Sequence, residues 1–182
     1  NEVSDIFVRP LTGRIGAEIS GVDLSRDLPQ ATIGEIRRVL LDYLVIFFRD
    51  QDITPEQQIA FVAKFGEPDL YPFVRGLDDY PQITPVLKLP DETVNFGGVW
   101  HSDTVYLDEP PMGTILYAKE LPAMGGDTLF ADQYQAYEDL SAPLRDFLQG
   151  LKAVNSAAKG AAAATRSTRV ADAGTGENRI LE

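Results

Sequence analysis

A histidine and an aspartate separated by one residue, His101 and Asp103, have the types and spacing to hold a metal ion. On a strand, side chains at positions i and i+2 point to the same face, so both could reach one ion. Imidazole plus carboxylate is two-thirds of the 2-His-1-carboxylate triad, which leaves positions on Fe(II) open for a chelating cosubstrate and dioxygen. The tripeptide equally fits a surface histidine beside a carboxylate or an interior histidine satisfied by a hydrogen bond, so its spacing leaves the metal hypothesis open.

The composition excludes several kinds of chemistry. The 182 residues include no cysteine and one histidine, which excludes disulfides, Cys-ligated zinc, iron–sulfur clusters, thiol nucleophiles and a His-rich zinc site within one chain. The net charge of −12 disfavours nucleic-acid binding, which needs clustered Lys and Arg. The longest apolar run, 43–48, is far shorter than a membrane span. We therefore expect a cytoplasmic protein that binds neither nucleic acid nor membrane.

Apolar periodicity and turn residues predict the elements before residue 67. Strands are expected at 6–9, 16–19 and 44–48, and helices at 33–43 and from residue 54 onward. Thr54 and Gln57 have the spacing of a capping box, with Pro55 at the first helical position. Gly66 is placed to end that helix.

Beyond residue 66 the sequence changes character. Prolines and glycines break up residues 67–99, which predicts a long loop, of the kind that is commonly functional, with one strand at 83–89. Further strands are expected at 113–118, 128–131 and 151–155, and helices at 132–140 and 141–148. Many short strands with a few helices predict a mostly β fold, a β-sandwich or jelly roll with flanking helices.

Several separate motifs carry a resemblance to a known family. They are "WHSD" (100–103), the proline pair 110–111, "GGDT" (125–128), "AYEDL" (136–140), "GAEISGVDLS" (16–25), "VIFFRDQDITPEQQIAF" (45–61) and "KFGE" (64–67). Together they resemble the taurine dioxygenase/2,4-D dioxygenase family of Fe(II)- and 2-oxoglutarate-dependent oxygenases, in the same order and over about residues 6–155. The resemblance implies Fe(II), 2-oxoglutarate and O2 as cofactor and cosubstrates.

The resemblance also implies roles for individual residues. His101 and Asp103 match the first two iron ligands and would be the catalytic pair, and Thr128 matches a threonine that helps to hold 2-oxoglutarate. Residues 67–99 match the lid segment that closes over the substrate. Three residues are therefore candidates for the substrate pocket, namely Tyr71, Asn95 and Trp100.

The implied reaction is hydroxylation of a small, anionic organic substrate, sulfonate-like or aryloxyalkanoate-like, with release of succinate and CO2. Tyr71 and Pro72 stand where taurine enzymes carry a substrate-binding His before the Pro, and Gly97 and Gly98 flank the site without side chains. These differences argue against taurine itself as the substrate.

The family also needs a second histidine and an arginine near the C-terminus of a longer chain, and this sequence has no second histidine. Three explanations stay open: an incomplete version of a longer enzyme, a truncated and inactive product, or a partner chain that supplies the rest. We expect 6–156 to form the N-terminal and central part of one jelly-roll (double-stranded β-helix) domain without its C-terminal strands, and 157–182 to be a mobile segment. Open sheet edges would favour a homo-oligomer. The alternative function is a catalytically inactive jelly-roll binding domain left by truncation.

Overall fold

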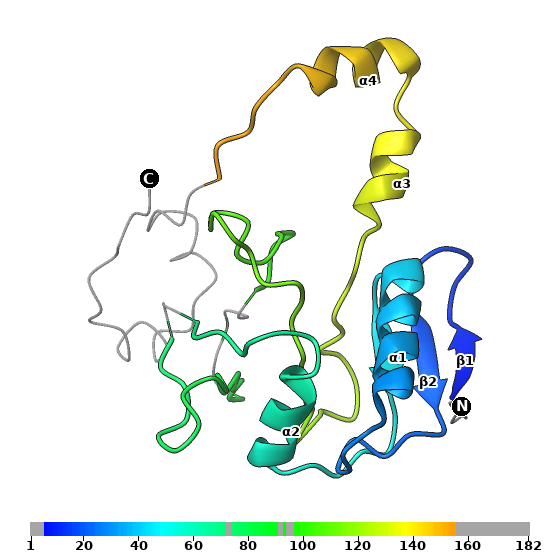
Figure 1. Cartoon of the computed structure of the whole chain (residues 1–182). Coiled ribbons are helices and arrows are strands. Elements are labelled where there is room, and N and C mark those ends of the chain that lie inside the picture. The colour runs from blue at the N-terminus through cyan, green and yellow to red at the C-terminus, as the bar shows by residue number, and fades with distance from the viewer. Residues whose placement is uncertain (1–5, 72–73, 91–92, 94–96, 156–182) are drawn as a thin grey trace. The chain divides into compact units, whose positions relative to one another are not determined.

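The computed structural model describes residues 6–71, 74–90, 93 and 97–155 (Figure 1). The elements are β1 (Phe7–Pro10), β2 (Ala17–Ser20), α1 (Gln30–Tyr43), β3 (Ile46–Phe48), α2 (Pro55–Val62), α3 (Gln133–Glu138) and α4 (Ala142–Gln149). The chain divides into two compact units. Unit 1 is Asn1–Gly66 with Ile115–Leu151, and unit 2 is Glu67–Thr114 with Lys152–Glu182. Unit 2 begins at the residue where the sequence changes to a proline- and glycine-rich loop.

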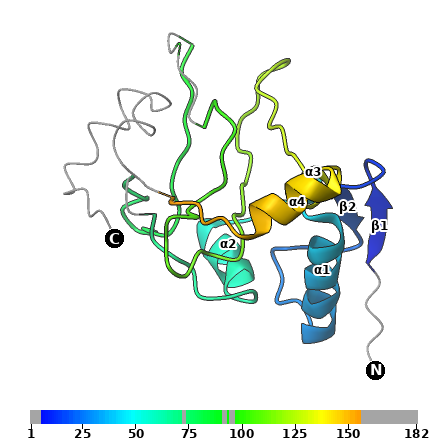
Figure 2. The same ribbon diagram turned by 90° about the horizontal axis from the view of Figure 1, so that it is seen from above.

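The sheet of unit 1 has the order β1-β2-β3, with β1 antiparallel and β3 parallel to β2. Parallel neighbours need a crossover connection, and α1 provides it between β2 and β3. The register pairs Val8 with Ile19 and Ile19 with Phe48, which puts these apolar side chains on one face of the sheet. Helix α1 contacts both β2 and β3. Figure 1 and Figure 2 show α1 beside β2.

The core of unit 1 comes entirely from residues 17 to 61. Its buried members are Ala17, Ile19, Leu24, Ile33, Ile36, Val39, Ile53 and Phe61. The ring of Phe61 meets those of Phe48 and Phe65 edge-on, with centroids 5.9 and 5.2 Å apart. Ile36 and Ala17 have no exposed surface. Burial of this apolar set is the main stabilising term available to the unit.

Two glutamines join the loop after β2 to the segment after β3. The Gln51 amide donates to the Val22 carbonyl at 3.2 Å, and its oxygen accepts the Leu24 N–H at 2.8 Å. The Gln57 amide donates to the Ser25 carbonyl at 3.1 Å. These two side chains thereby satisfy backbone groups of the loop that form no hydrogen bonds within a strand or helix. The "GVDLS" and "RDQDITPEQ" motifs therefore have a structural role.

On the outer face of the sheet, Glu18 lies between two arginines. Its carboxylate accepts from Arg9 at 2.9 Å and from Arg49 at 3.3 Å. The hydrogen bond from Arg49 is the largest cause that holds the pKa of Glu18 below its ordinary value; partial desolvation opposes it and Arg9 adds to it. Register explains the cluster, because Arg9 pairs directly with Glu18 across the ladder.

The predictions for the first 66 residues are confirmed, apart from the end of α2. The capping box is complete, with Thr54 accepting from the Gln57 N–H and Gln57 accepting from the Thr54 N–H. The prediction that Gly66 ends the helix is wrong, because α2 ends at Val62. The chain continues there in 3₁₀-type turns, in which the N–H groups of Lys64 and Phe65 donate to the carbonyls three residues earlier.

The strands predicted at 83–89, 113–118, 128–131 and 151–155 are wrong: none of these segments is a strand in the structure. A strand is defined by backbone pairing with a neighbouring strand, and the sheet in the described residues consists of β1, β2 and β3. Helix accordingly exceeds strand in the described part of the chain, contrary to a mostly β content. The jelly roll, its missing C-terminal strands and the single domain over 6–156 stay predictions, and 157–182 lies outside the described residues.

A tyrosine attaches the segment 115–121 to the core instead of a strand ladder. The Tyr117 hydroxyl donates to the Gln51 carbonyl at 3.1 Å and accepts the Ile53 N–H at 3.4 Å, and the ring packs against the core. The Lys119 ammonium lies 4.3 Å from the ring centroid. The side chain of Tyr117 therefore holds this segment against the core, a role that the sequence analysis predicted for pairing between strands.

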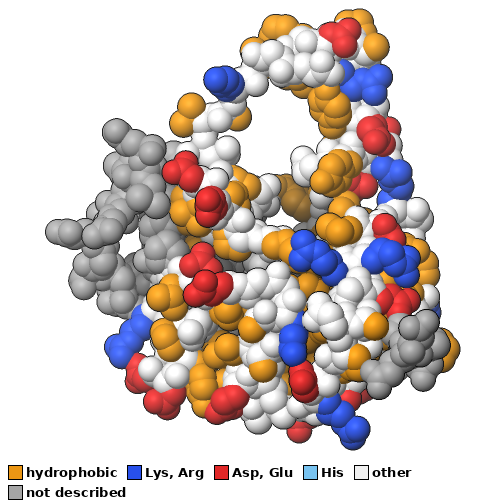
Figure 3. Space-filling view, in the orientation of Figure 1, with side chains coloured by type: hydrophobic (Ala, Val, Ile, Leu, Met, Phe, Trp, Pro, Cys, Tyr) orange, Lys and Arg blue, Asp and Glu red, His pale blue; other side chains and the backbone are white. Residues whose placement is uncertain are grey.

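Helices α3 and α4 confirm the two helices predicted at 132–140 and 141–148. Asp132 caps α3 by accepting from the N–H groups of Tyr134 and Gln135. Arg14 lies 3.5 Å from Asp132 and 3.3 Å from Glu138, which ties the loop after β1 to α3. Apolar side chains lie at the surface of α4 (Figure 3), and Phe147 is 65% exposed. Within the described ranges, every helix is too short or too polar to cross a membrane.

Candidate functional site

His101 and Asp103 lie side by side in unit 2. The His101 Nε2 and the Asp103 Oδ1 are 3.0 Å apart, and the two side chains are 49% and 59% exposed. Our assumption that the pair shares one face of a strand is wrong, because both residues are in a loop. The backbone turns immediately after them, at Thr104, whose φ of 50° is left-handed. The two donors meet within the loop before this turn, whereas the sequence pattern assigned their approach to strand alternation.

The other ring nitrogen of His101 is held by the backbone. Nδ1 lies 2.7 Å from the Val99 carbonyl oxygen. A carbonyl can only accept, so this contact places the hydrogen on Nδ1 and assigns Nε2 to face Asp103. Metal-binding histidines commonly have this arrangement, because the second-nitrogen hydrogen bond fixes both the tautomer and the ring orientation.

The two oxygens of Asp103 have separate environments. Oδ1 faces His101, and Oδ2 accepts a hydrogen bond from the Thr114 hydroxyl at 3.3 Å. The sequence analysis missed Thr114, since nothing in its position eleven residues after the aspartate indicates a contact. The two oxygens therefore differ, because Oδ2 has a protein donor and Oδ1 faces the histidine.

The backbone at Gly97 passes close to the imidazole. Its φ is +68°, and a Cβ at this position would lie 3.3 Å from the His101 Cε1. Both the left-handed backbone and the tight space favour glycine. The "FGGVWH" sequence did show the glycine, but only the structure shows that it borders the ring.

The pair fits a divalent iron ion as two of its ligands. Two adjacent donors on an octahedral ion, each about 2.1 Å from it, lie about 3 Å apart, the separation of Nε2 and Oδ1 here. Neutral imidazole and a carboxylate are also the donor types of the non-haem iron triad. Among residues 6–71, 74–90, 93 and 97–155, no group of three or more His, Cys, Asp or Glu side chains could hold a metal. Within these ranges the candidate site thus has two protein donors, His101 and Asp103.

Three of the four other residues named from the sequence lie within the described ranges. Trp100 precedes His101 directly and is 70% exposed, and Tyr71 is 36% exposed. Asn95 lies outside the described residues. Thr128 is exposed in unit 1, after two glycines with positive φ. The roles of these four residues stay predictions.

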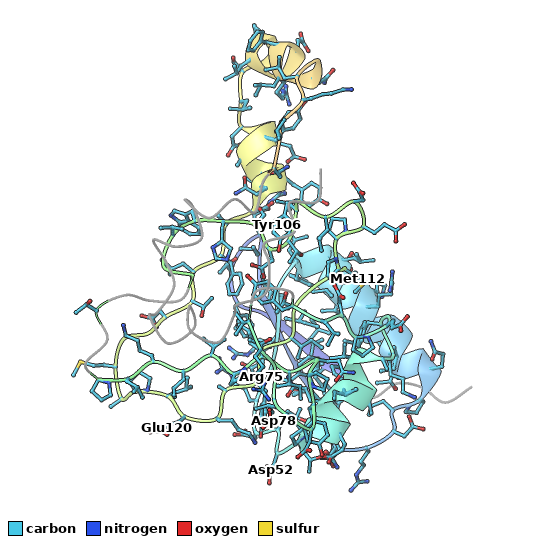
Figure 4. The ribbon with its side chains drawn as sticks, turned by 90° about the vertical axis from the view of Figure 1, so that its left-hand side faces the viewer. Asp52, Arg75, Asp78, Tyr106, Met112 and Glu120 are labelled. Atoms are coloured by element: carbon cyan, nitrogen blue, oxygen red, sulfur yellow. The ribbon has the colours of Figure 1, made fainter. Side chains whose placement is uncertain are left out.

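Charged groups elsewhere in unit 2 pair locally. Figure 4 shows Arg75 beside Asp78, and the two form an ion pair across a turn. In the following residues, the Leu77 N–H donates to the Ile83 carbonyl at 2.9 Å. Arg75 is therefore engaged within its own loop.

Comparison with known proteins gives concordant matches. The profile of the taurine catabolism dioxygenase TauD, TfdA family matches residues 8–179. An alpha-ketoglutarate-dependent sulfate ester dioxygenase of Pseudomonas putida is 39% identical over 84% of this chain and 50% of its own length. An alkylsulfatase of Acinetobacter baylyi is 38% identical over 86% of this chain and 49% of its own length.

A solved structure extends the match to the fold. The crystal structure of a taurine dioxygenase from Burkholderia xenovorans has a TM-score of 0.68 and 40% identity, covering 80% of this chain and 52% of that one. The chain spans about half the length of the curated relatives it matches. Since the profile covers nearly all of the 182 residues and the fold agrees, the chain belongs to the TauD, TfdA family of taurine catabolism dioxygenases.

Proposed function

We propose that the protein is an Fe(II)- and 2-oxoglutarate-dependent dioxygenase that hydroxylates a small organic anion. The observation that carries the proposal is the 3.0 Å distance between His101 Nε2 and Asp103 Oδ1. The other nitrogen of the histidine and the other oxygen of the aspartate are each held by a hydrogen bond. Membership of the family supports iron as the metal and 2-oxoglutarate as the cosubstrate.

Each residue has an assigned task. His101 and Asp103 would hold the iron, and the Thr128 hydroxyl would donate to the distal carboxylate of 2-oxoglutarate. Bound iron supplies the dioxygen chemistry. In sum, one substrate C–H bond, one O2 and one 2-oxoglutarate become one C–OH, one succinate and one CO2. Trp100, Tyr71 and Asn95 would border the substrate and keep water away from it.

The substrate class rests on what similar proteins are named for. The relatives in Pseudomonas putida and Acinetobacter baylyi are named for sulfate esters, and a Sphingobium herbicidovorans relative, 32% identical, is named for (S)-phenoxypropionate. Sulfate esters, sulfonates and aryloxyalkanoates share an organic chain that ends in an oxyanion. We propose a substrate of this kind, with alkyl sulfates as the first to test.

The architecture proposed with this function is the jelly roll, supported by the similarity to the Burkholderia xenovorans taurine dioxygenase. Unpaired outer edges of β1 and β3 in the described sheet support self-association. Sedimentation of the protein at several concentrations tests the homo-oligomer, and a mass that stays monomeric would count against it.

Anaerobic titration with Fe(II) and 2-oxoglutarate tests the function. The expected result is a weak visible charge-transfer band, followed on admission of O2 by succinate formation that depends on an alkyl sulfate or aryloxyalkanoate. The matched control is His101→Ala, which should show neither. A folded protein that binds 2-oxoglutarate without the band or turnover would support the alternative, a binding domain without catalysis. The observation that favours this alternative is that the described residues offer two protein metal donors and not the three of the non-haem iron triad.

A further inference from the structure

The loop 103–114 begins and ends at two residues that bond to each other. The Thr114 hydroxyl donates to the Asp103 Oδ2 at 3.3 Å. Inside the loop, the Leu107 N–H donates to the Thr104 carbonyl at 3.0 Å, and Thr104 has a left-handed backbone. For a β-branched residue that conformation is costly, so the surrounding loop must hold it.

We propose that Thr114 is a positioning residue, which orients the Asp103 carboxylate so that one chosen oxygen, Oδ1, faces the metal position beside His101. The proposal rests on the iron site described under Proposed function. Thr114 would not touch the metal, the cosubstrate or the substrate; it would act through Asp103.

The chemistry of the carboxylate explains why a hydroxyl is needed. The terminal torsion of an aspartate is broad and roughly two-fold, so a carboxylate without an outer partner presents either oxygen and turns freely. A donor on Oδ2 restricts that rotation and favours Oδ1 as the oxygen that faces the metal position. Losing such an outer partner typically weakens metal binding 10- to 100-fold.

The two ligands are supported by different means. The Val99 backbone carbonyl holds His101, and substitution cannot remove it. A side chain holds Asp103, and substitution can. Of these two supports, only the hydrogen bond from Thr114 depends on which amino acid occupies the position.

The single histidine of the chain makes a direct measurement possible. The ¹⁵N and ¹H signals of the His101 imidazole report the site without overlap from other histidines. Mn(II) is a suitable probe because it is less readily oxidised than Fe(II) and broadens the signals of the groups that it binds. The imidazole signals are followed as Mn(II) is added to the full chain, in the presence of 2-oxoglutarate.

Three variants separate positioning from a general structural effect. Thr114→Val keeps the side-chain shape and removes the hydroxyl, and it should raise the Mn(II) concentration at half-broadening by about 10-fold or more. Thr114→Ser restores a hydroxyl and should return to within about two-fold of the original protein. Thr84→Val, the same change at a threonine of unit 2 that bonds to neither ligand among the described residues, should leave the titration unchanged. Thermal melting checks that all three variants are folded.

The outcomes distinguish this inference from the proposed function. If the unaltered protein shows no broadening of His101, the metal site itself fails, and Thr114 loses its role with it. If the unaltered protein is broadened and Thr114→Val has the same midpoint, the metal site stands and the positioning role is overturned. Failure of Thr114→Ser to recover in a folded protein would also overturn it.

Discussion

The segment 17–61 and the loop 67–114 hold their important residues in opposite ways. In the first, eight apolar side chains are buried, and a sheet, two helices and two glutamine bridges order the chain. In the second, no described residue is buried or belongs to a helix or strand, and the candidate ligands are about half exposed. Packing orders one region, and individual hydrogen bonds order the other.

This difference separates stability from chemistry along the chain. Removing a buried apolar group leaves a cavity and costs stability throughout a cooperative unit. Removing an exposed ligand from a loop costs little stability, because its surroundings are mostly water. Substitutions in the two regions should therefore have opposite signatures, and the following predictions, from the largest effect to the smallest, test this.

Substitution of either ligand should abolish chemistry and spare stability. His101→Ala and Asp103→Ala each remove one of two protein donors, so the Fe(II)–2-oxoglutarate band and substrate-dependent succinate formation should fall by at least about 100-fold. The thermal midpoint should stay nearly unchanged, because both side chains are half exposed. Succinate assays and melting curves on the same samples check both halves. Retained turnover in either variant would contradict the assignment.

Truncation of a core side chain should do the reverse. Ile36 on α1 has no exposed surface, and Ile36→Ala should lower the free energy of unfolding by about 2–5 kcal/mol. Leu41→Ala is the matched control, because Leu41 lies on the same helix with 62% of its surface exposed, and its cost should be small. Urea titration measures both. Equal costs for the two variants would mean that α1 does not cover the sheet as described.

Removal of one hydroxyl should test the bridge between the later segment and the core. Tyr117→Phe leaves the Ile53 N–H and the Gln51 carbonyl without this partner, at a cost of about 1–3 kcal/mol. Because Tyr117 is the anchor of residues 115–121, limited proteolysis in this segment should also become faster. Tyr134→Phe, on the exposed side of α3, is the control. Unchanged proteolysis in Tyr117→Phe would show that packing of the ring is sufficient.

The smallest effect concerns pH and the outer face of the sheet. The pKa of Glu18 lies below its ordinary value, chiefly because of Arg49 and then Arg9, so its contribution to stability is present above the unfolded pKa of about 4.3. That contribution is lost as the pH falls through the lowered folded value. The stability difference between the original protein and Glu18→Gln should therefore be larger at neutral pH than in acid. Chemical unfolding at several pH values measures it, with Glu120→Gln as the control; a difference independent of pH would argue against the ion pairs.

Prediction from sequence succeeded where local rules and core patterning agree. A few neighbouring positions are enough to predict the helix start at Thr54 and Gln57 and the buried face of α1. It failed at 83–89, 113–118, 128–131 and 151–155, because a short apolar stretch between turn residues says nothing about a partner strand. Tyr117 illustrates the difference, since its hydroxyl bonds to the backbone of the Gln51–Ile53 segment and no strand forms there.

By itself, the sequence determined which donors exist: one histidine, an aspartate two residues later, and no cysteine. With the surrounding motifs, it also indicated the family that the profile match confirmed. Only the tertiary structure decided how the donors are held: the Val99 carbonyl holds the imidazole ring, and the Thr114 hydroxyl donates to the second oxygen of the Asp103 carboxylate. The physical reason is that residue types and chemistry are local properties of the chain. Which oxygen of a carboxylate faces a metal depends on a contact eleven residues away, which spacing does not encode.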